Sequence, residues 1–193
     1  MFFSKFKEII YQWSKGRWWS FRLFFLFFLV YIALKYADDP NYPSILGGIN
    51  LIIHEAGHIF LSWAPVTVML MGGTLFQIVI PIASIFMFLT QPDLFACSFS
   101  GVWLASNLYN ISIYIADARA QALPLVTYSA GDPIHDWNYL LFKFGILQHD
   151  LLISAGVKIL AFVVMWLSIL YGIWIIWIMV LSNRDCPNKS SLT

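Results

Sequence analysis

Two histidines and one glutamate have the types and spacing that metal-dependent hydrolysis requires. His54 and His58 are four residues apart, and Glu55 follows the first of them, in the order His-Glu-Ala-Gly-His. On a helix, side chains four residues apart leave the same face, so both imidazoles can bind one Zn²⁺. Zinc lowers the pKa of a bound water from about 15.7 to about 7, and Glu55 is placed to act as its general base. The spacing therefore predicts a zinc site with Glu55 as the catalytic residue.

A third metal ligand is expected from a later polar segment, residues 131–138. A catalytic zinc usually has three protein ligands and one open position. We favour Asp136 as the third ligand, because a carboxylate also neutralises the charge of the ion; His135 is the alternative. Asp132 is expected to cap a helix that begins with Pro133 and to support the site from there.

A second polar stripe lies in the apolar stretch that begins near residue 94. Its members recur at three- and four-residue steps and so share one helix face: Asn107, Asn110, Tyr114 and Asp117. Asn107 and Asn110 are candidates to bind the substrate or to orient the metal ligands. The other interpretation is hydrogen bonding between helices, which polar residues in membrane spans commonly supply.

The composition is that of an integral membrane protein. Hydrophobic residues make up 60% of the chain and charged residues 11%, whereas a soluble domain carries about 25% charged residues. Aromatic residues, at 18%, fit the belts found at membrane interfaces. The net charge of +1 gives no support to a nucleic-acid partner, so the lipid bilayer is the expected environment.

Apolar stretches predict an all-α fold in a single membrane domain, residues 1–193, with about five transmembrane helices. A span needs roughly 20 mostly apolar residues. The predicted spans are about 21–36, 44–63, 74–90, 94–116 and 152–181. Pro65 and the pair Gly72-Gly73 bracket the connection between the second and third spans. Residues 1–20 are expected to form an amphipathic interfacial segment, and residues 117–150 a cytoplasmic or interfacial one.

The basic residues predict the orientation of this arrangement. Five of them precede or open the first span: Lys5, Lys7, Lys15, Arg17 and Arg22. The positive-inside rule therefore places the N-terminus in the cytoplasm. With five spans, the second runs inward, so His54, His58 and the 117–150 segment would meet near the cytoplasmic leaflet.

At residues 54–58 the sequence resembles the site-2 protease family of intramembrane zinc metallopeptidases. The resemblance implies that His54 and His58 are ligands, that Glu55 is the catalytic acid and base, and that an Asp from a later segment completes the site. It also implies cleavage of peptide bonds in or beside the membrane segments of a protein substrate. The nearest counterpart of the family's late motif is the segment 135–138, His-Asp-Trp-Asn, which lacks the usual Gly after the Asp. The chain also lacks a PDZ-type insert.

Two other functions remain open at the level of the sequence. The same zinc chemistry would serve a membrane hydrolase that acts on a lipid amide or ester. A non-catalytic, metal-containing membrane protein that binds other membrane segments is the third possibility. Few residues are expected outside the bilayer, so a homo-oligomer or a recruiting partner could supply recognition.

Overall fold

The chain folds into a bundle of helices. The computed structural model describes residues 2–124 and 134–184, and within these ranges it contains helices and no strand. The elements, in chain order, are α1 (Phe2–Ser14), α2 (Trp19–Asp38), α3 (Leu46–Phe60), α4 (Val66–Thr90), α5 (Ala96–Ala116), α6 (Asp136–Lys143), the short 3-10 helix η1 (Leu147–His149) and α7 (Asp150–Arg184).

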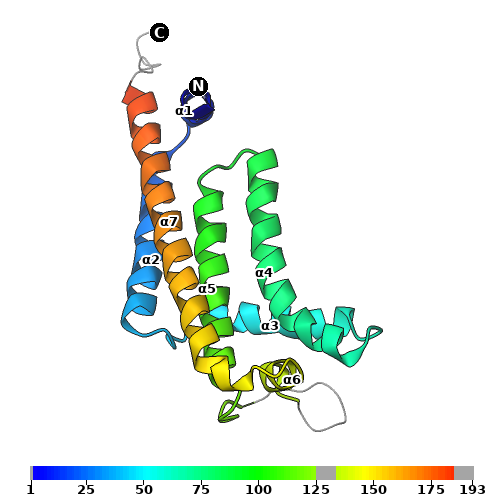
Figure 1. Cartoon of the computed structure of the whole chain (residues 1–193). Coiled ribbons are helices and arrows are strands. Elements are labelled where there is room, and N and C mark those ends of the chain that lie inside the picture. The colour runs from blue at the N-terminus through cyan, green and yellow to red at the C-terminus, as the bar shows by residue number, and fades with distance from the viewer. Residues whose placement is uncertain (1, 125–133, 185–193) are drawn as a thin grey trace, which may run out of the picture.

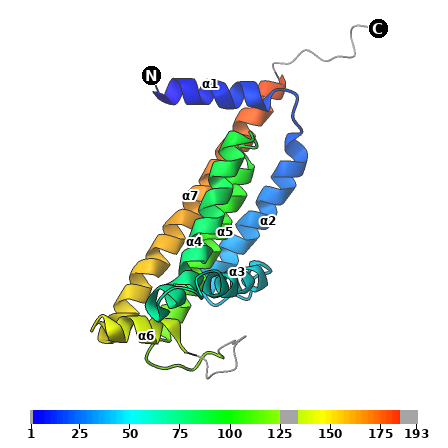
Figure 2. The ribbon, with the colours of Figure 1, turned by 90° about the vertical axis from the view of Figure 1, so that its right-hand side faces the viewer.

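Four helices run along the bundle and three lie across its ends. Helices α2, α4, α5 and α7 run side by side, while α1 lies across one end and α3 and α6 lie across the other (Figures 1 and 2). The beginning of the chain and the end of α7 are therefore at the same end of the bundle.

Helix α5 forms the centre of the bundle, and its small residues let α7 approach closely. A Cβ atom added at Gly101 would overlap the side chain of Ser168, and one added at Gly172 would lie 2.5 Å from Ser98 Oγ. The Ser98 hydroxyl donates to the carbonyl of Ser168 across this interface, at 2.7 Å. Small residues with interhelical hydrogen bonds are typical of helix packing in membranes.

Three of the helices, α2, α4 and α7 with η1, are long and apolar enough to cross a membrane. Together with the absence of strands in the described ranges, this agrees with the prediction of an all-α protein of the membrane type. Large apolar side chains on the outside of these helices remain exposed, such as Phe24 on α2, Val79 on α4 and Leu167 on α7.

Helix α3 differs from the span predicted at 44–63. It has 15 residues, about 22 Å at 1.5 Å per residue, which is shorter than the roughly 30 Å hydrocarbon core. It also lies across the bundle instead of along it (Figure 1). Helix α4 begins at Val66 instead of residue 74, so the whole connection from α3 is only five residues long.

The glycines that were expected to mark that connection lie inside α4 and have another purpose. A Cβ atom at Gly57 would overlap the backbone of Gly72, and one at Gly72 would lie 2.5 Å from the Gly57 carbonyl oxygen. The backbones of α3 and α4 therefore touch. An added Cβ atom at Gly47 or Gly48, earlier on α3, would have nothing within 4 Å.

The arrangement also changes the expected topology. Helix α2 runs from the α1 end of the bundle to the α3 end, so α1 and the His-Glu-Ala-Gly-His helix lie at opposite ends (Figure 2). The prediction that the N-terminus and the histidines share one side of the membrane required five spans, with α3 as one of them. Because α3 lies across the bundle, a count of five spans no longer supports that prediction.

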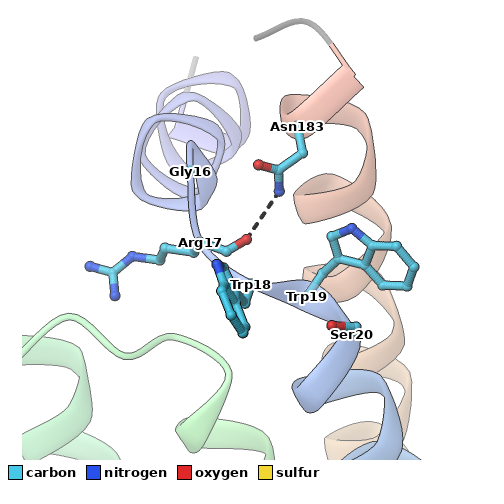
Figure 3. A pocket seen from close by; sticks show the side chains of 6 residues that line it. All are labelled: Gly16, Arg17, Trp18, Trp19, Ser20 and Asn183. Atoms are coloured by element: carbon cyan, nitrogen blue, oxygen red, sulfur yellow. Dashed lines mark hydrogen bonds between the residues drawn. The ribbon is translucent and has the colours of Figure 1, made fainter. Parts of the chain in front are cut away.

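A cavity of about 520 Å³ opens at the α1 end, where α1 turns into α2 (Figure 3). It is lined by Gly16, Arg17, Trp18, Trp19, Ser20 and Asn183. The amide of Asn183 donates to the backbone carbonyl of Arg17 at 3.1 Å, which ties the turn to the last helix. This cavity lies at the end of the bundle opposite α3 and α6.

The glycine contact yields a first prediction. Gly57→Ala should lower the thermal unfolding temperature of the detergent-solubilised protein, because the new methyl group forces α3 away from Gly72. Gly48→Ala is the matched control on the same helix; its Cβ meets nothing, and alanine favours a helix over glycine by about 1 kcal/mol. Equal unfolding temperatures for the two variants would contradict the close contact.

Candidate metal centre

A buried asparagine fixes the rotation of the crosswise helix α3 about its own axis. Asn50 is fully buried; its amide nitrogen donates to Asn110 Oδ1 at 2.8 Å and to Ser106 Oγ at 3.2 Å. Its carbonyl oxygen accepts from Trp103 Nε1 at 2.9 Å. All three partners are on α5, so one α3 side chain is tied to the central helix at three points. His54, one turn later, is thereby turned toward the interior.

Three potential ligand atoms meet at the end of the bundle. His54 Nε2 lies 3.0 Å from His58 Nε2 and 3.0 Å from Asp136 Oδ2. His58 Nε2 lies 3.1 Å from the same carboxylate oxygen. His54 and Asp136 are buried, with 8% and 3% of their surface exposed, and His58 is half-buried. Among the described residues, this is the group of histidine and acidic side chains close enough together to hold a metal ion.

The opposite ring nitrogens of both histidines bind to α4. His58 Nδ1 lies 2.9 Å from the carbonyl oxygen of Met69, and His54 Nδ1 lies 3.0 Å from Gln77 Oε1. An oxygen of this kind can only accept, so each Nδ1 carries the hydrogen and each Nε2 of a neutral imidazole presents a lone pair. Metal-bound histidines are usually oriented by such a hydrogen bond from the second nitrogen.

His54 Nε2, His58 Nε2 and Asp136 Oδ2 therefore form a triangle with sides of 3.0 to 3.1 Å, and each of these atoms presents a lone pair. Such atoms repel each other unless protons or a metal ion lie among them. For a tetrahedral ion with bonds of about 2.0–2.1 Å, neighbouring ligand atoms are about 3.3 Å apart. The triangle is close to this size, so the donor set and its dimensions fit a metal ion.

Asp136 reaches the histidines from the first turn of α6. The N-cap of this helix is His135, whose side chain accepts from the backbone N–H of Asn138 at 3.2 Å. The helix thus begins at Asp136 and not at Pro133, and the predicted cap by Asp132 is wrong. Asp132 itself lies outside the described residues. Lys143, in the last turn of α6, donates to Thr67 and so fastens the helix to α4.

His135, the alternative third ligand, lies beside the triangle but is not part of it. Its Nδ1 is occupied by the cap, and its Nε2 faces Asp117 Oδ2 at 3.3 Å without the geometry of a hydrogen bond. Burial lowers the pKa of His135, although the nearby carboxylate of Asp117 acts in the opposite direction. The imidazole is therefore a neutral structural group at neutral pH.

Glu55 is half-buried and follows His54 on α3, but it is not part of the triangle. Its carboxylate is near enough to His58 and Tyr114 to interact with both electrostatically. Within the described ranges it makes no hydrogen bond or ion pair with a side chain. A carboxylate in this position is available to a water molecule or a substrate at the centre.

The two asparagines on α5 have different surroundings. Asn110 accepts from Asn50 and so belongs to the contact that holds α3. Asn107 is fully buried and donates to the carbonyl of Trp103 within its own helix, at 3.0 Å. Asn110 supports the helix that carries the histidines, and a role for either residue in substrate binding stays a prediction.

The sequence did not predict that two residues of α4 contact the His54 ring. Gln77, 5% exposed, binds the His54 ring, and an added Cβ atom at Gly73 would lie 2.5 Å from His54 Cε1. A lone glutamine in an otherwise apolar helix was a signal for the first. The second had no signal, because only the contact shows that His54 fills the space above Gly73.

In comparisons with known proteins, no family model, curated protein or solved structure matches the chain.

The geometry predicts which residues retain metal. Purified wild-type protein should contain about one divalent ion per chain, measured by inductively coupled plasma mass spectrometry. His58→Ala and Asp136→Ala should each lose it, because two ligands remain. His135→Ala is the matched control beside Asp136 and should keep the ion. Retention in Asp136→Ala together with loss in His135→Ala would move the third ligand to the neighbouring residue.

Proposed function

We propose that the protein is a membrane zinc metallopeptidase that cleaves peptide bonds in or next to membrane segments of its substrates. The observation that carries this proposal is the triangle of His54, His58 and Asp136 atoms, with Glu55 directly after the first of these residues in the sequence. Two neutral imidazoles and one carboxylate are a ligand set of catalytic zinc sites. A binding protein or a structural metal site would not need Glu55 next to the first histidine.

The residues divide the reaction between them. Zinc, held by His54, His58 and Asp136, would acidify a water molecule and polarise the carbonyl group of the substrate. Glu55 takes a proton from that water, and the oxygen adds to the carbonyl carbon. Glu55 then returns the proton to the amine that leaves, so the peptide bond is replaced by a carboxylic acid and a free amine.

The position of the site at one end of the bundle supports a substrate in extended form. Inside a helix, the carbonyl groups of a membrane segment are already hydrogen-bonded. At the end of the bundle, where α3 and α6 lie crosswise (Figure 2), a segment that leaves the membrane can unwind and present a carbonyl to the metal. A lipid amide or ester is the second candidate for the same chemistry.

A glutamine at position 55 tests the reaction. Wild-type protein in detergent micelles, incubated with a proteome-derived peptide library, should generate new N-termini detectable by mass spectrometry. Glu55→Gln should retain the metal and lose about 10²-fold or more of this activity, because general base catalysis contributes about 10²–10⁴-fold. Glu8→Gln, the same change on the exposed face of α1, is the control.

Two results would count against this assignment. Full activity in Glu55→Gln would exclude Glu55 as the base. A wild-type protein that leaves the peptide library intact but hydrolyses N-acyl amides or esters in a parallel lipid mixture would favour the lipid substrate instead.

We also propose an orientation in which the metal centre faces away from the cytoplasm. Most basic residues gather at the α1 end: Lys5, Lys7, Lys15, Arg17, Arg22 and Arg184. Fewer are at the other end, with α3 and α6: Lys35 in the last turn of α2, Arg119 and Lys143, with Lys158 near the beginning of α7. The positive-inside rule then assigns the α1 end to the cytoplasm and the metal centre to the opposite face.

Cysteine labelling checks this orientation. In a background with Cys97 and Cys186 replaced by serine, Gln148→Cys, exposed on η1, should react with a membrane-impermeant maleimide in intact cells. Gln12→Cys, exposed on α1, should react only after the membrane is opened. The reverse pattern would place the metal centre on the cytoplasmic side.

A further inference from the structure

The phenol of Tyr114 borders the metal centre and has a hydrogen-bond donor to offer. Tyr114 is half-buried on α5, and its oxygen accepts from the backbone N–H of Asp136 at 3.2 Å. The same Asp136 contributes Oδ2 to the triangle. The phenol therefore lies next to one of the three ligand residues, and it also interacts electrostatically with Glu55.

The ring of Tyr114 is held between two histidines. It meets the His54 ring edge-on, with centroids 5.7 Å apart, and it lies against the His135 ring at 4.3 Å. A ring packed against two others has few rotamers open to it. The phenolic oxygen is therefore fixed relative to His54 before any substrate arrives, which is the condition for an effective transition-state donor.

The phenolic hydrogen is not used within the described part of the chain. A tyrosine hydroxyl can accept and donate at the same time. Here the oxygen accepts from the backbone N–H of Asp136, and no described residue accepts a hydrogen bond from the hydroxyl. Other polar side chains nearby already have partners. Asn110 is bound to Asn50, and the His135 ring is held by its cap and faces Asp117.

We propose that Tyr114 donates a hydrogen bond to the carbonyl oxygen of the substrate while that oxygen becomes negatively charged. This inference rests on the proposed function of the same centre. As the water oxygen adds to the carbonyl carbon, the electron pair of the C=O double bond moves onto the carbonyl oxygen. The O–H of Tyr114 stabilises this charge; no proton leaves the phenol, and no covalent bond to the tyrosine forms.

The competing role for Tyr114 is structural. Without its hydroxyl, the backbone N–H of Asp136 loses an acceptor, so Asp136 could shift and weaken the metal site. A structural role lowers the affinity for the metal itself. A donor role lowers the affinity for a tetrahedral anion at the metal and leaves the metal affinity nearly unchanged.

The test compares two metal-binding probes on Tyr114→Phe. A phosphinic dipeptide is tetrahedral and anionic, with one oxygen for the metal and a second for a donor. A thiol dipeptide of the same side chains binds metal through sulfur and places no such oxygen near the phenol. The control is Tyr109→Phe, the same change on the same helix. The ring of Tyr109 stacks on the ring of Tyr36, with centroids 4.8 Å apart.

Metal affinity is measured by competition with a chelator, and probe affinity by isothermal titration calorimetry on the metal-loaded full chain in detergent. We expect Tyr114→Phe to bind the phosphinate about 10- to 100-fold more weakly, as loss of a hydrogen bond to a charged group implies. Affinity for the thiol and for the metal should change less than about threefold, and Tyr109→Phe should match the wild type for both probes.

The remaining outcomes contradict the proposal in distinguishable ways. Equal phosphinate affinity in Tyr114→Phe and wild type would remove Tyr114 as a donor and leave the hydrolase proposal intact. A loss of metal affinity as large as the loss for the phosphinate would assign Tyr114 a structural role. Wild-type protein that holds metal yet binds neither probe would overturn the hydrolase proposal and the role of Tyr114 with it.

Discussion

The contact between the backbones of α3 and α4 is the constraint on which the metal centre depends. Gly57 and Gly72 leave no room for a side chain between the two helices. That closeness lets one helix carry both histidines while the other orients them, through the carbonyl of Met69 and the amide of Gln77. A wider separation would release both Nδ1 atoms, and the Nε2 lone pairs would no longer converge. The short helix α6 then needs to add only one carboxylate.

The grouping of the candidate metal ligands was more predictable from the sequence than the arrangement of the helices. His54 and His58 are four residues apart on one helix, and this local spacing fixes their shared face wherever the helix lies. Asp136 could be named as a candidate because a third ligand was required and few ionisable residues remain in so apolar a chain. Its role as a zinc ligand remains a proposal, but the structure does bring its carboxylate to both histidines.

The direction of α3 could not be predicted, because hydropathy reports how apolar a segment is and not how it is oriented. Gly72 and Gly73 were interpreted as a connection because glycine commonly marks turns; between packed helices, it also permits close approach. The cap of α6 was misplaced for a similar reason. Asp is a frequent N-cap, and only the folded chain shows that the His135 ring accepts from Asn138.

Asp136 is close in space to both histidines but lies 82 positions after His54 along the chain. An ion that bound all three would act as a removable crosslink, closing a long loop that covers α4 and α5 and ends on α6. Closing such a loop costs conformational entropy that grows slowly with its length. The measured affinity for the ion would therefore include the free energy of docking α6 against α3. The same three metal–ligand bonds would then hold the ion for the reaction and keep α6 docked against α3.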